Sequence, residues 1–189
     1  SARAAEPAAA LPKAEIEKIV RDYLMREPEI IYEAIQELQQ RRAVAEAERQ
    51  QKAVEASKAQ LFATAGDPVI GNPKGDVTLV QFFDYRCGYC RSMVPGLRNL
   101  VGKDKGLRMV MKEFPVLGPD SVVAARAALA AEKQGRFTDF HLALMGSRVV
   151  DEVAIKGVAG RLGRGVGRLV ADMISESVER RLQANAQLA

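Results

Sequence analysis

The sequence predicts an α/β protein preceded by a long helical segment, and three observations support this fold class. Residues 77–84 and 107–114 are apolar, β-prone runs, and a helix-compatible run lies between them. The only two cysteines, Cys87 and Cys90, stand where the first run turns into that helix. Residues 14–60 consist mainly of helix-forming side chains. A strand–helix–strand unit of this kind is expected to be parallel and right-handed.

The N-terminal part divides into a leader and a helical stalk. Residues 1–14 are rich in Ala and Pro without a period, which indicates a disordered leader. Helical periodicity follows and is interrupted at Pro28. An apolar stripe after the proline consists of Ile31, Ile35 and Leu38. This stripe has no evident partner within its own short segment, so residues 15–64 are expected to form an oligomerisation segment and linker. The alternative is that the stripe packs back on its own domain.

Residues 65–189 are expected to form the second domain. Pro68–Gly71 is typical of a short edge strand, followed by a turn and the strand–helix–strand unit, whose helix contains Pro95. Everything after Pro119 is predicted to be helical. Four helices are expected there: one capped by Ser121 and ending near Gln134, one over residues 137–146, one capped by Asp151 and ending near Gly163, and one from Val166 to about Gln187.

The cysteine spacing C-x-x-C at a strand-to-helix turn indicates a redox site. If Cys87 lies at the helix N-terminus, unpaired backbone N–H groups and the positive end of the helix dipole stabilise its thiolate. Cys90 lies one turn further along and can attack a mixed disulfide on Cys87. We therefore expect Cys87 to be the nucleophile and Cys90 the resolving thiol.

Three other interpretations of the cysteine pair have less support. A structural disulfide across two intervening residues would close a very small loop and stabilise the fold little. A structural zinc site needs four ligands, which two cysteines and one distant histidine do not supply. The third interpretation is two inert, buried thiols. His141, the only histidine, stands between Phe140 and Leu142 and is expected to pack in the core rather than act as a base.

Two strings of residues carry a resemblance to a known family: FFDYRCGYC at 82–90 and KEFPVLG at 112–118. Over about residues 15–189 the chain resembles the DsbA-like thiol:disulfide interchange proteins, and most of all the group of the suppressor-of-copper-sensitivity protein C, ScsC. The resemblance implies a thioredoxin-like fold with a helical insertion at about 118–187. It also implies that the N-terminal helical stalk is an oligomerisation module.

The same resemblance implies a periplasmic thiol:disulfide oxidoreductase that isomerises or reduces misfolded or reduced secreted proteins. Gly88 and Tyr89, the dipeptide also present in the disulfide isomerase DsbC, would tune both thiols. No cofactor is implied. The implied partners are a membrane redox protein that keeps the site reduced or oxidised and further copies of the chain, three in the relatives, joined through residues 15–62. Relatives commonly carry Glu near Gln81, and because Gln cannot titrate, the rate of proton transfer at Cys90 is in question.

Two alternative functions would use the same thiols. Cu(I) is a soft cation that two thiolates can hold, so one alternative is a copper-tolerance protein with Cu(I) at Cys87 and Cys90. The other is a DsbA-like dithiol oxidase.

No further metal site is predicted. Basic and acidic residues alternate despite the net charge of +4, which argues against nucleic-acid binding. No apolar run is long enough for a transmembrane segment, and residues 1–7 lack the apolar region of a signal peptide, which would have been removed from a periplasmic chain.

The C-terminal part departs from the family pattern. Thioredoxin-like domains end with a cis-proline loop, two antiparallel strands and a helix, whereas no proline follows Pro119 here. We therefore expect these strands to be absent from this chain and the sheet edge beside residues 107–114 to be unpaired. The chain would then be a fragment of a longer protein, or the strands would come from another chain.

Overall fold

The computed structural model describes residues 12–62, 66–163 and 166–189. Most of the predicted leader, residues 1–11, lies outside these ranges. The chain divides into two compact units, with the division between Glu55 and Ala56, and each unit is described by itself.

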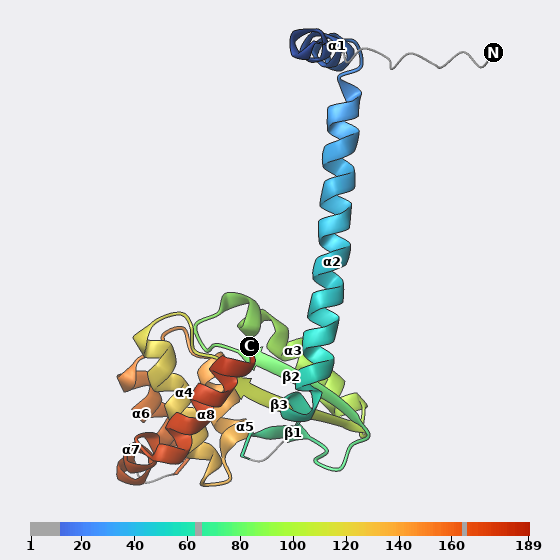
Figure 1. Cartoon of the computed structure of the whole chain (residues 1–189). Coiled ribbons are helices and arrows are strands. Elements are labelled where there is room, and N and C mark those ends of the chain that lie inside the picture. The colour runs from blue at the N-terminus through green and yellow to red at the C-terminus, as the bar shows by residue number, and fades with distance from the viewer. Residues whose placement is uncertain (1–11, 63–65, 164–165) are drawn as a thin grey trace, which may run out of the picture. The chain divides into compact units, whose positions relative to one another are not determined.

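The first unit consists of α1 (Lys13–Arg26) and most of α2 (Glu29–Phe62), separated at Pro28 as predicted (Figure 1). Neither helix buries a single residue within this chain. The apolar stripe on α2 is accordingly half exposed, with 48% of Ile31, 47% of Ile35 and 48% of Leu38 accessible. Packing of this stripe on its own domain stays the alternative to oligomerisation.

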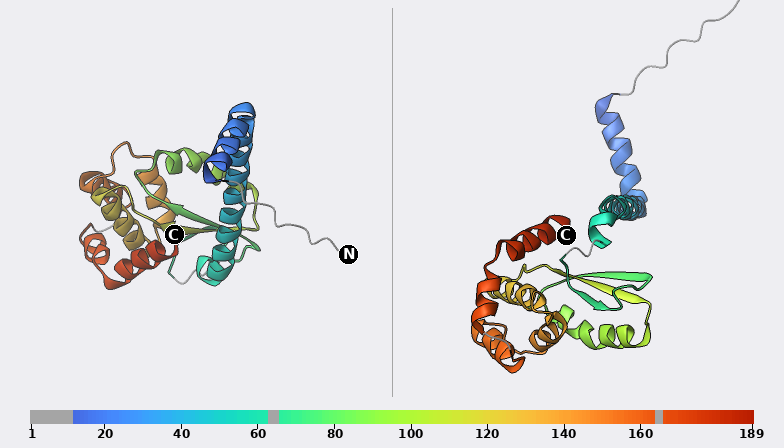
Figure 2. Two further views of the ribbon diagram at one scale, coloured as in Figure 1. Left: turned by 45° about the horizontal axis from the view of Figure 1, so that its top comes forward. Right: turned by 90° about the horizontal axis from the view of Figure 1, so that it is seen from below.

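The second unit contains a three-stranded sheet in the order β1-β3-β2. Its strands are β1 (Val69–Gly71), β2 (Val77–Phe83) and β3 (Leu107–Glu113). The predicted strand–helix–strand unit is confirmed, because β2 runs parallel to β3 and α3 (Gly88–Lys103) connects them along one face of the sheet (Figure 2, right). The helix continues through Pro95.

The prediction of an unpaired edge beside residues 107–114 is wrong. The short strand β1 pairs antiparallel with β3, so β3 is the central strand. The turn after β1 holds this arrangement, because the backbone N–H of Asn72 donates to Leu107 O at 2.8 Å and its side-chain amide donates to Lys105 O at 2.8 Å. Within the described residues, β1 and β2 are the outer strands.

Five helices follow the sheet and gather on one side of it in Figure 1. They are α4 (Pro119–Glu132), α5 (Phe137–Met145), α6 (Glu152–Arg161), α7 (Val166–Met173) and α8 (Glu176–Leu188). Asp151 caps α6 as predicted, accepting the backbone N–H of Ala154 at 2.8 Å. The expectation of one helix from Val166 to about Gln187 is wrong: the backbone is extended at Ser175, where α8 starts anew.

The start of α4 also differs from the prediction. Gly118, not Ser121, is the N-cap, and Pro119 occupies the first helical position, where its missing N–H costs nothing. Gly118 has φ of 107°, a conformation that favours glycine, and a Cβ there would lie 3.2 Å from the guanidinium of Arg86. Ser121 thereby lies in the first turn of α4, and its hydroxyl can bond another partner.

The main core lies between the sheet and the helices. Its largest members are Phe83, Tyr85, Met111, Phe140 and Leu144, packed against the Ala-rich face of α4. A smaller apolar cluster joins α4 to α8 through Ala125, Leu129, Val178 and Leu182. The small alanine side chains let these helices approach closely.

One buried ionic cluster lies beside β3. The ammonium group of Lys112 is 4% exposed and pairs with the carboxylate of Asp67, and it also donates to the backbone O of Gln60 at 3.2 Å. Asp67 is further paired with Arg181 of α8 at 3.0 Å. These contacts satisfy a buried cation and connect the last turn of α2, the segment before β1 and α8 to the central strand.

Candidate active site

Cys87 and Cys90 lie where the sequence places them, at the turn from β2 into α3. Cys87 is the N-cap residue of α3, and its Sγ accepts the backbone N–H of Cys90 at 3.4 Å. Cys90 lies in the first turn of the helix and is packed against the main core. Both residues are free thiols in this structure. The structure thus gives the two sulfurs different surroundings, one at the helix end and one against the core.

The two thiols have pKa values shifted in opposite directions. Hydrogen bonding from the backbone N–H of Cys90, followed by the Cys90 side chain, lowers the pKa of Cys87. Burial is the main cause that raises the pKa of Cys90. Because the thiolate is the reactive form, this difference favours Cys87 as the attacking sulfur and keeps Cys90 protonated until later in a reaction.

The two residues between the cysteines are at the surface. An added Cβ at Gly88 would meet no atom within 4 Å, so space alone does not require glycine there. Tyr89 is 85% exposed, and its backbone N–H is among the groups that lower the pKa of Cys87. Tuning of the thiols by Gly88 and by the Tyr89 side chain stays a prediction.

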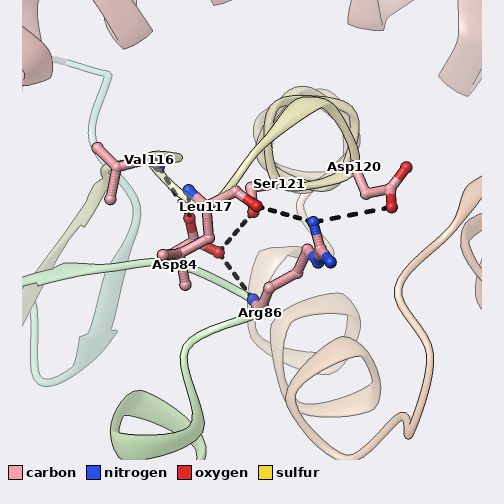
Figure 3. A network of polar contacts seen from close by, with 6 residues as sticks. All are labelled: Asp84, Arg86, Val116, Leu117, Asp120 and Ser121. Atoms are coloured by element: carbon pink, nitrogen blue, oxygen red, sulfur yellow. Dashed lines mark hydrogen bonds and ion pairs between the residues drawn. The ribbon is translucent and has the colours of Figure 1, made fainter.

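Asp84, three residues before Cys87, is the centre of a polar network that the sequence analysis did not anticipate (Figure 3). Its carboxylate is buried and accepts four hydrogen bonds. The donors are Arg86 N at 2.7 Å, Ser121 Oγ at 2.8 Å, Val116 N at 2.8 Å and Leu117 N at 3.0 Å. The network fastens the loop between β3 and α4 to the segment that carries the cysteines. The only signal in the sequence was an acidic residue directly after an apolar strand.

Tyr85, the next residue, belongs to a second buried cluster. Its hydroxyl donates to Glu113 Oε1 at 3.1 Å and lies 3.1 Å from Nδ1 of His141. Burial raises the pKa of Glu113 and of Tyr85, and burial lowers the pKa of His141 to about 4. Burial thus favours the neutral form of each of the three side chains, as expected for polar groups enclosed in a core.

His141 packs in the core, in line with the expectation from its apolar neighbours. Its ring stacks on Phe137 with centroids 5.3 Å apart and meets the edge of Phe83 at 4.9 Å. Within the described residues, the ring and hydrogen-bond contacts of His141 are made to Phe83, Tyr85 and Phe137. The cluster instead joins helix α5 to the active-site segment through Tyr85.

Gln81 of β2 lines an apolar cavity of about 220 Å³ together with residues of α3, α5 and the sheet. Its side-chain oxygen is buried without a hydrogen-bond partner. A titratable acid, Glu113, nevertheless lies close to Gln81 in the sheet. Gln81 pairs with Met111 of β3, and Glu113 is two residues further along that strand. The sequence analysis considered only the Gln81 position and missed Glu113.

The described residues contain neither a metal-ligand cluster nor a membrane-spanning helix. No group of three or more His, Cys, Asp or Glu side chains there could hold a metal ion. No helix within these ranges is long and apolar enough to cross a membrane.

Comparison with known proteins agrees with the fold and the two-part organisation. Residues 13–45 match the family model of the copper resistance protein ScsC N-terminal domain, and residues 63–149 match a thioredoxin model. A thioredoxin-like oxidoreductase from Silicibacter pomeroyi DSS-3 is 42% identical, with a TM-score of 0.67, and the match covers 69% of this chain and 76% of that chain. The chain belongs to the thioredoxin-like thiol-disulfide oxidoreductases. This confirms the resemblance drawn from the two strings around the cysteines.

Two further structures place this thioredoxin-like chain in its family. A periplasmic thioredoxin-like protein from Salmonella enterica serovar Typhimurium is 32% identical with a TM-score of 0.62, and the match covers 70% of this chain and 75% of that one. Proteus mirabilis ScsC in a transitional conformation is 28% identical with a TM-score of 0.65, covering 95% of this chain and 81% of that one. The latter likeness includes the N-terminal helices.

Curated relatives match over a shorter part. The Na(+)/H(+) antiporter NhaA 1 of Salinispora arenicola is 36% identical over 77 residues, which are 40% of this chain. The match spans only 12% of the antiporter's length.

Proposed function

We propose that this thioredoxin-like chain exchanges disulfides with protein substrates, with Cys87 as the nucleophile and Cys90 as the resolving thiol. The observation that carries the proposal is the unequal environment of the two sulfurs. Cys87 lies at the N-terminus of α3 with a lowered pKa, and Cys90 lies against the core with a raised pKa. This asymmetry provides a reactive thiolate and a second thiol held in reserve.

The reaction proceeds by two exchanges. The Cys87 thiolate attacks one sulfur of a substrate disulfide, a mixed disulfide forms, and the other substrate sulfur leaves as a thiolate. Cys90 then loses its proton and attacks the Cys87 sulfur, which releases the second substrate thiol and leaves a Cys87–Cys90 disulfide. The substrate gains two electrons and the protein loses two. In isomerisation a substrate thiol attacks the mixed disulfide instead, Cys87 is released, and no net oxidation occurs.

We assign the isomerase or reductase direction on misfolded or reduced secreted proteins in the periplasm. Three features support this assignment: the Gly88-Tyr89 dipeptide, the likeness to a periplasmic relative, and the likeness to ScsC over both parts of the chain. Isomerisation requires Cys87 to stay reduced, so a membrane redox partner would supply electrons. A DsbA-like oxidase would instead need a partner that keeps the site oxidised.

Refolding of scrambled ribonuclease tests this function. The wild-type chain is expected to restore ribonuclease activity, and Cys87→Ser is expected to remove at least about nine tenths of that rate, because no other thiol has a lowered pKa. Insulin reduction on the same samples separates reductase from isomerase activity. Equal ribonuclease refolding by wild type and Cys87→Ser would contradict the proposal.

We further propose that the apolar stripe on α2 joins several copies of the chain through residues 15–62. Ile31, Ile35 and Leu38 are half exposed although they occupy one side of the helix. Association would place several cysteine pairs on one large substrate and raise their effective concentration. The number of copies, three, is proposed only by analogy with the ScsC relatives.

Replacing Ile31, Ile35 and Leu38 together by Gln is expected to reduce the mass measured by light scattering to that of a single chain. The physical reason is that about 2 kcal/mol of burial per large aliphatic side chain would be lost at every contact. A matched control replaces Val44 and Val54 of the same helix, which are also exposed, by Gln. A wild-type chain that is already monomeric would rule out this part of the proposal.

Cu(I) binding at the same thiols is the second candidate, and the family name of residues 13–45 favours it. Two reduced thiols at one helix end are available to a soft cation. The described residues offer no additional cluster of ligands around them. The two thiols have pKa values shifted in opposite directions, which favours nucleophilic attack by one of them. A metal held between two equal thiolates would not need this difference. Disulfide exchange is therefore the function that the geometry supports better.

A further inference from the structure

Asp84 is a buried charge with a complete set of partners. Both carboxylate oxygens accept two hydrogen bonds each, and all four partners are N–H or O–H donors. Such a donor set suits an ionised carboxylate, because a protonated one would have to donate as well. Only 4% of the residue is exposed, so water screens this charge poorly.

The charge lies beside the dithiol. The backbone O of Asp84 accepts the N–H of Cys87 at 3.1 Å, which keeps the two residues in one tight turn. A hydrogen bond from the Asp84 backbone lowers the pKa of Cys90. Repulsion by the Asp84 carboxylate, the smallest of the causes, raises the pKa of both Cys87 and Cys90. It acts against the backbone hydrogen bonds that lower the pKa of Cys87.

The guanidinium of Arg86 does not pair with Asp84. The guanidinium of Arg86 donates to Leu117 O at 2.7 Å and lies 3.9 Å from the Asp120 carboxylate (Figure 3). Asp84 is bonded to the backbone N–H of Arg86, not to its side chain. Its negative charge is therefore balanced by dipoles of the loop and by Ser121, and its field reaches the sulfurs.

We propose that Asp84 is a positioning residue that sets the redox potential of the Cys87–Cys90 pair, holding it more reducing, while it fastens the loop 115–118 beside the site. The inference rests on the proposed function, since it concerns the same dithiol. A fixed negative charge destabilises the thiolate of the reduced form more than the uncharged disulfide. The disulfide form is thereby favoured, and the dithiol is a better reductant. This bias suits a reductase or isomerase and not an oxidase.

Asp84→Asn tests the role of the charge. The variant keeps the size of the side chain, and the hydroxyl of Ser121 can turn to accept from the new amide, although at least one hydrogen bond is lost. We expect the pKa of Cys87, followed by thiolate absorbance, to fall. The equilibrium constant for oxidation of the dithiol by oxidised glutathione is expected to fall about threefold or more, because the thiolate is stabilised.

Asp120→Asn is the matched control. Asp120 carries the same charge at the start of α4, but it is half exposed and meets the cysteine segment only through the Arg86 guanidinium, at 3.9 Å. It should leave both quantities unchanged. Asp84→Ser, which keeps a hydroxyl acceptor without the charge, serves as a second variant if Asp84→Asn does not fold, and circular dichroism checks the fold of each.

The outcomes separate this inference from the proposed function. A folded Asp84 variant with the wild-type Cys87 pKa and the wild-type glutathione equilibrium overturns the role of Asp84 and leaves the proposed function intact. An equal shift in Asp120→Asn also overturns it, because the effect would then be one of general surface charge. A wild-type chain with no reversible dithiol–disulfide equilibrium would overturn the proposed function itself.

Discussion

A Cys90→Ser variant is expected to accumulate mixed disulfides with its substrates and to release them about a hundredfold or more slowly than the wild type. The reason is that attack by Cys90 is intramolecular, and a neighbouring group acts at a far higher effective concentration than a thiol in solution. Cys87 retains its place as N-cap of α3, so the first exchange proceeds. Non-reducing electrophoresis with a disulfide-bonded substrate would detect the trapped complex.

Cys87→Ser is the matched control for this experiment. It retains Cys90, whose pKa is raised by burial and which packs against the core, so it should trap little or no substrate. Equal trapping by the two single variants would mean that the two sulfurs are interchangeable. Rapid release by Cys90→Ser without added thiol would show that another group resolves the mixed disulfide.

The buried cluster around Tyr85 is expected to make stability depend on pH. Burial lowers the pKa of His141 to about 4 in the folded chain, whereas an unfolded histidine titrates near ~6.5. As the pH falls from 6.5 through 4, the unfolded state therefore binds a proton that the folded state does not, and His141 lowers the stability. The full effect is about 3 kcal/mol.

Urea unfolding of wild type and His141→Asn at pH 7 and at pH 4 measures this effect. Asn keeps a polar group near the Tyr85 hydroxyl but cannot gain the proton, so the advantage of wild type over the variant should shrink by about 3 kcal/mol at the lower pH. An advantage that is the same at both pH values would show that His141 does not titrate differently on unfolding.

Glu113→Gln is the matched variant, for which we expect stability to change with pH in the opposite direction. Burial raises the pKa of Glu113, so the stability that the wild-type carboxyl contributes is present below its ordinary pKa and is lost as the pH rises. Gln cannot ionise in the unfolded chain. The variant should therefore gain stability relative to wild type at neutral pH and lose that gain under acid conditions.

The fold could largely be predicted from local patterns around the cysteines. The apolar runs of β2 and β3, the turn at the cysteines and the helix-forming residues of α3 lie in one continuous stretch, so short-range patterns determine them. The short strand β1 was also predicted from its flanking turn residues. Its partner was not, because pairing of β1 with β3 joins residues about forty positions apart and depends on the turn at Asn72.

The helical part shows where local signals mislead. Ser121 has the residue type of an N-cap, but Gly118, three residues earlier, is the N-cap of α4, and the Ser121 hydroxyl donates to Asp84 instead. The division between α7 and α8 falls at Ser175, whose residue type is favoured at an N-cap, but the helix-forming residues on both sides of it predicted one continuous helix.

Of the residues at the candidate site, only the two cysteines were predicted from the sequence. Cys87 and Cys90 stand close together in the sequence, and their spacing carries the chemistry. Asp84 and the Tyr85 cluster depend on partners 28 to 56 residues away, which only the register of β3 and the packing of α5 bring near. Buried polar clusters of this kind are chosen by tertiary contact and leave little periodic trace.

The buried ammonium of Lys112 determines where this chain can be cut or spliced. One of its acceptors is the backbone oxygen of Gln60, in the last turn of α2. A hybrid that joins a foreign stalk at residue 66 would leave this cation short of an acceptor inside the protein, at a cost of about 1–3 kcal/mol. A junction before Ala56, where the two compact units divide, would preserve the contact. The end of the long helix α2 is thus part of the unit that carries the cysteines. Helical segments of another length or oligomeric state should therefore be joined before this end.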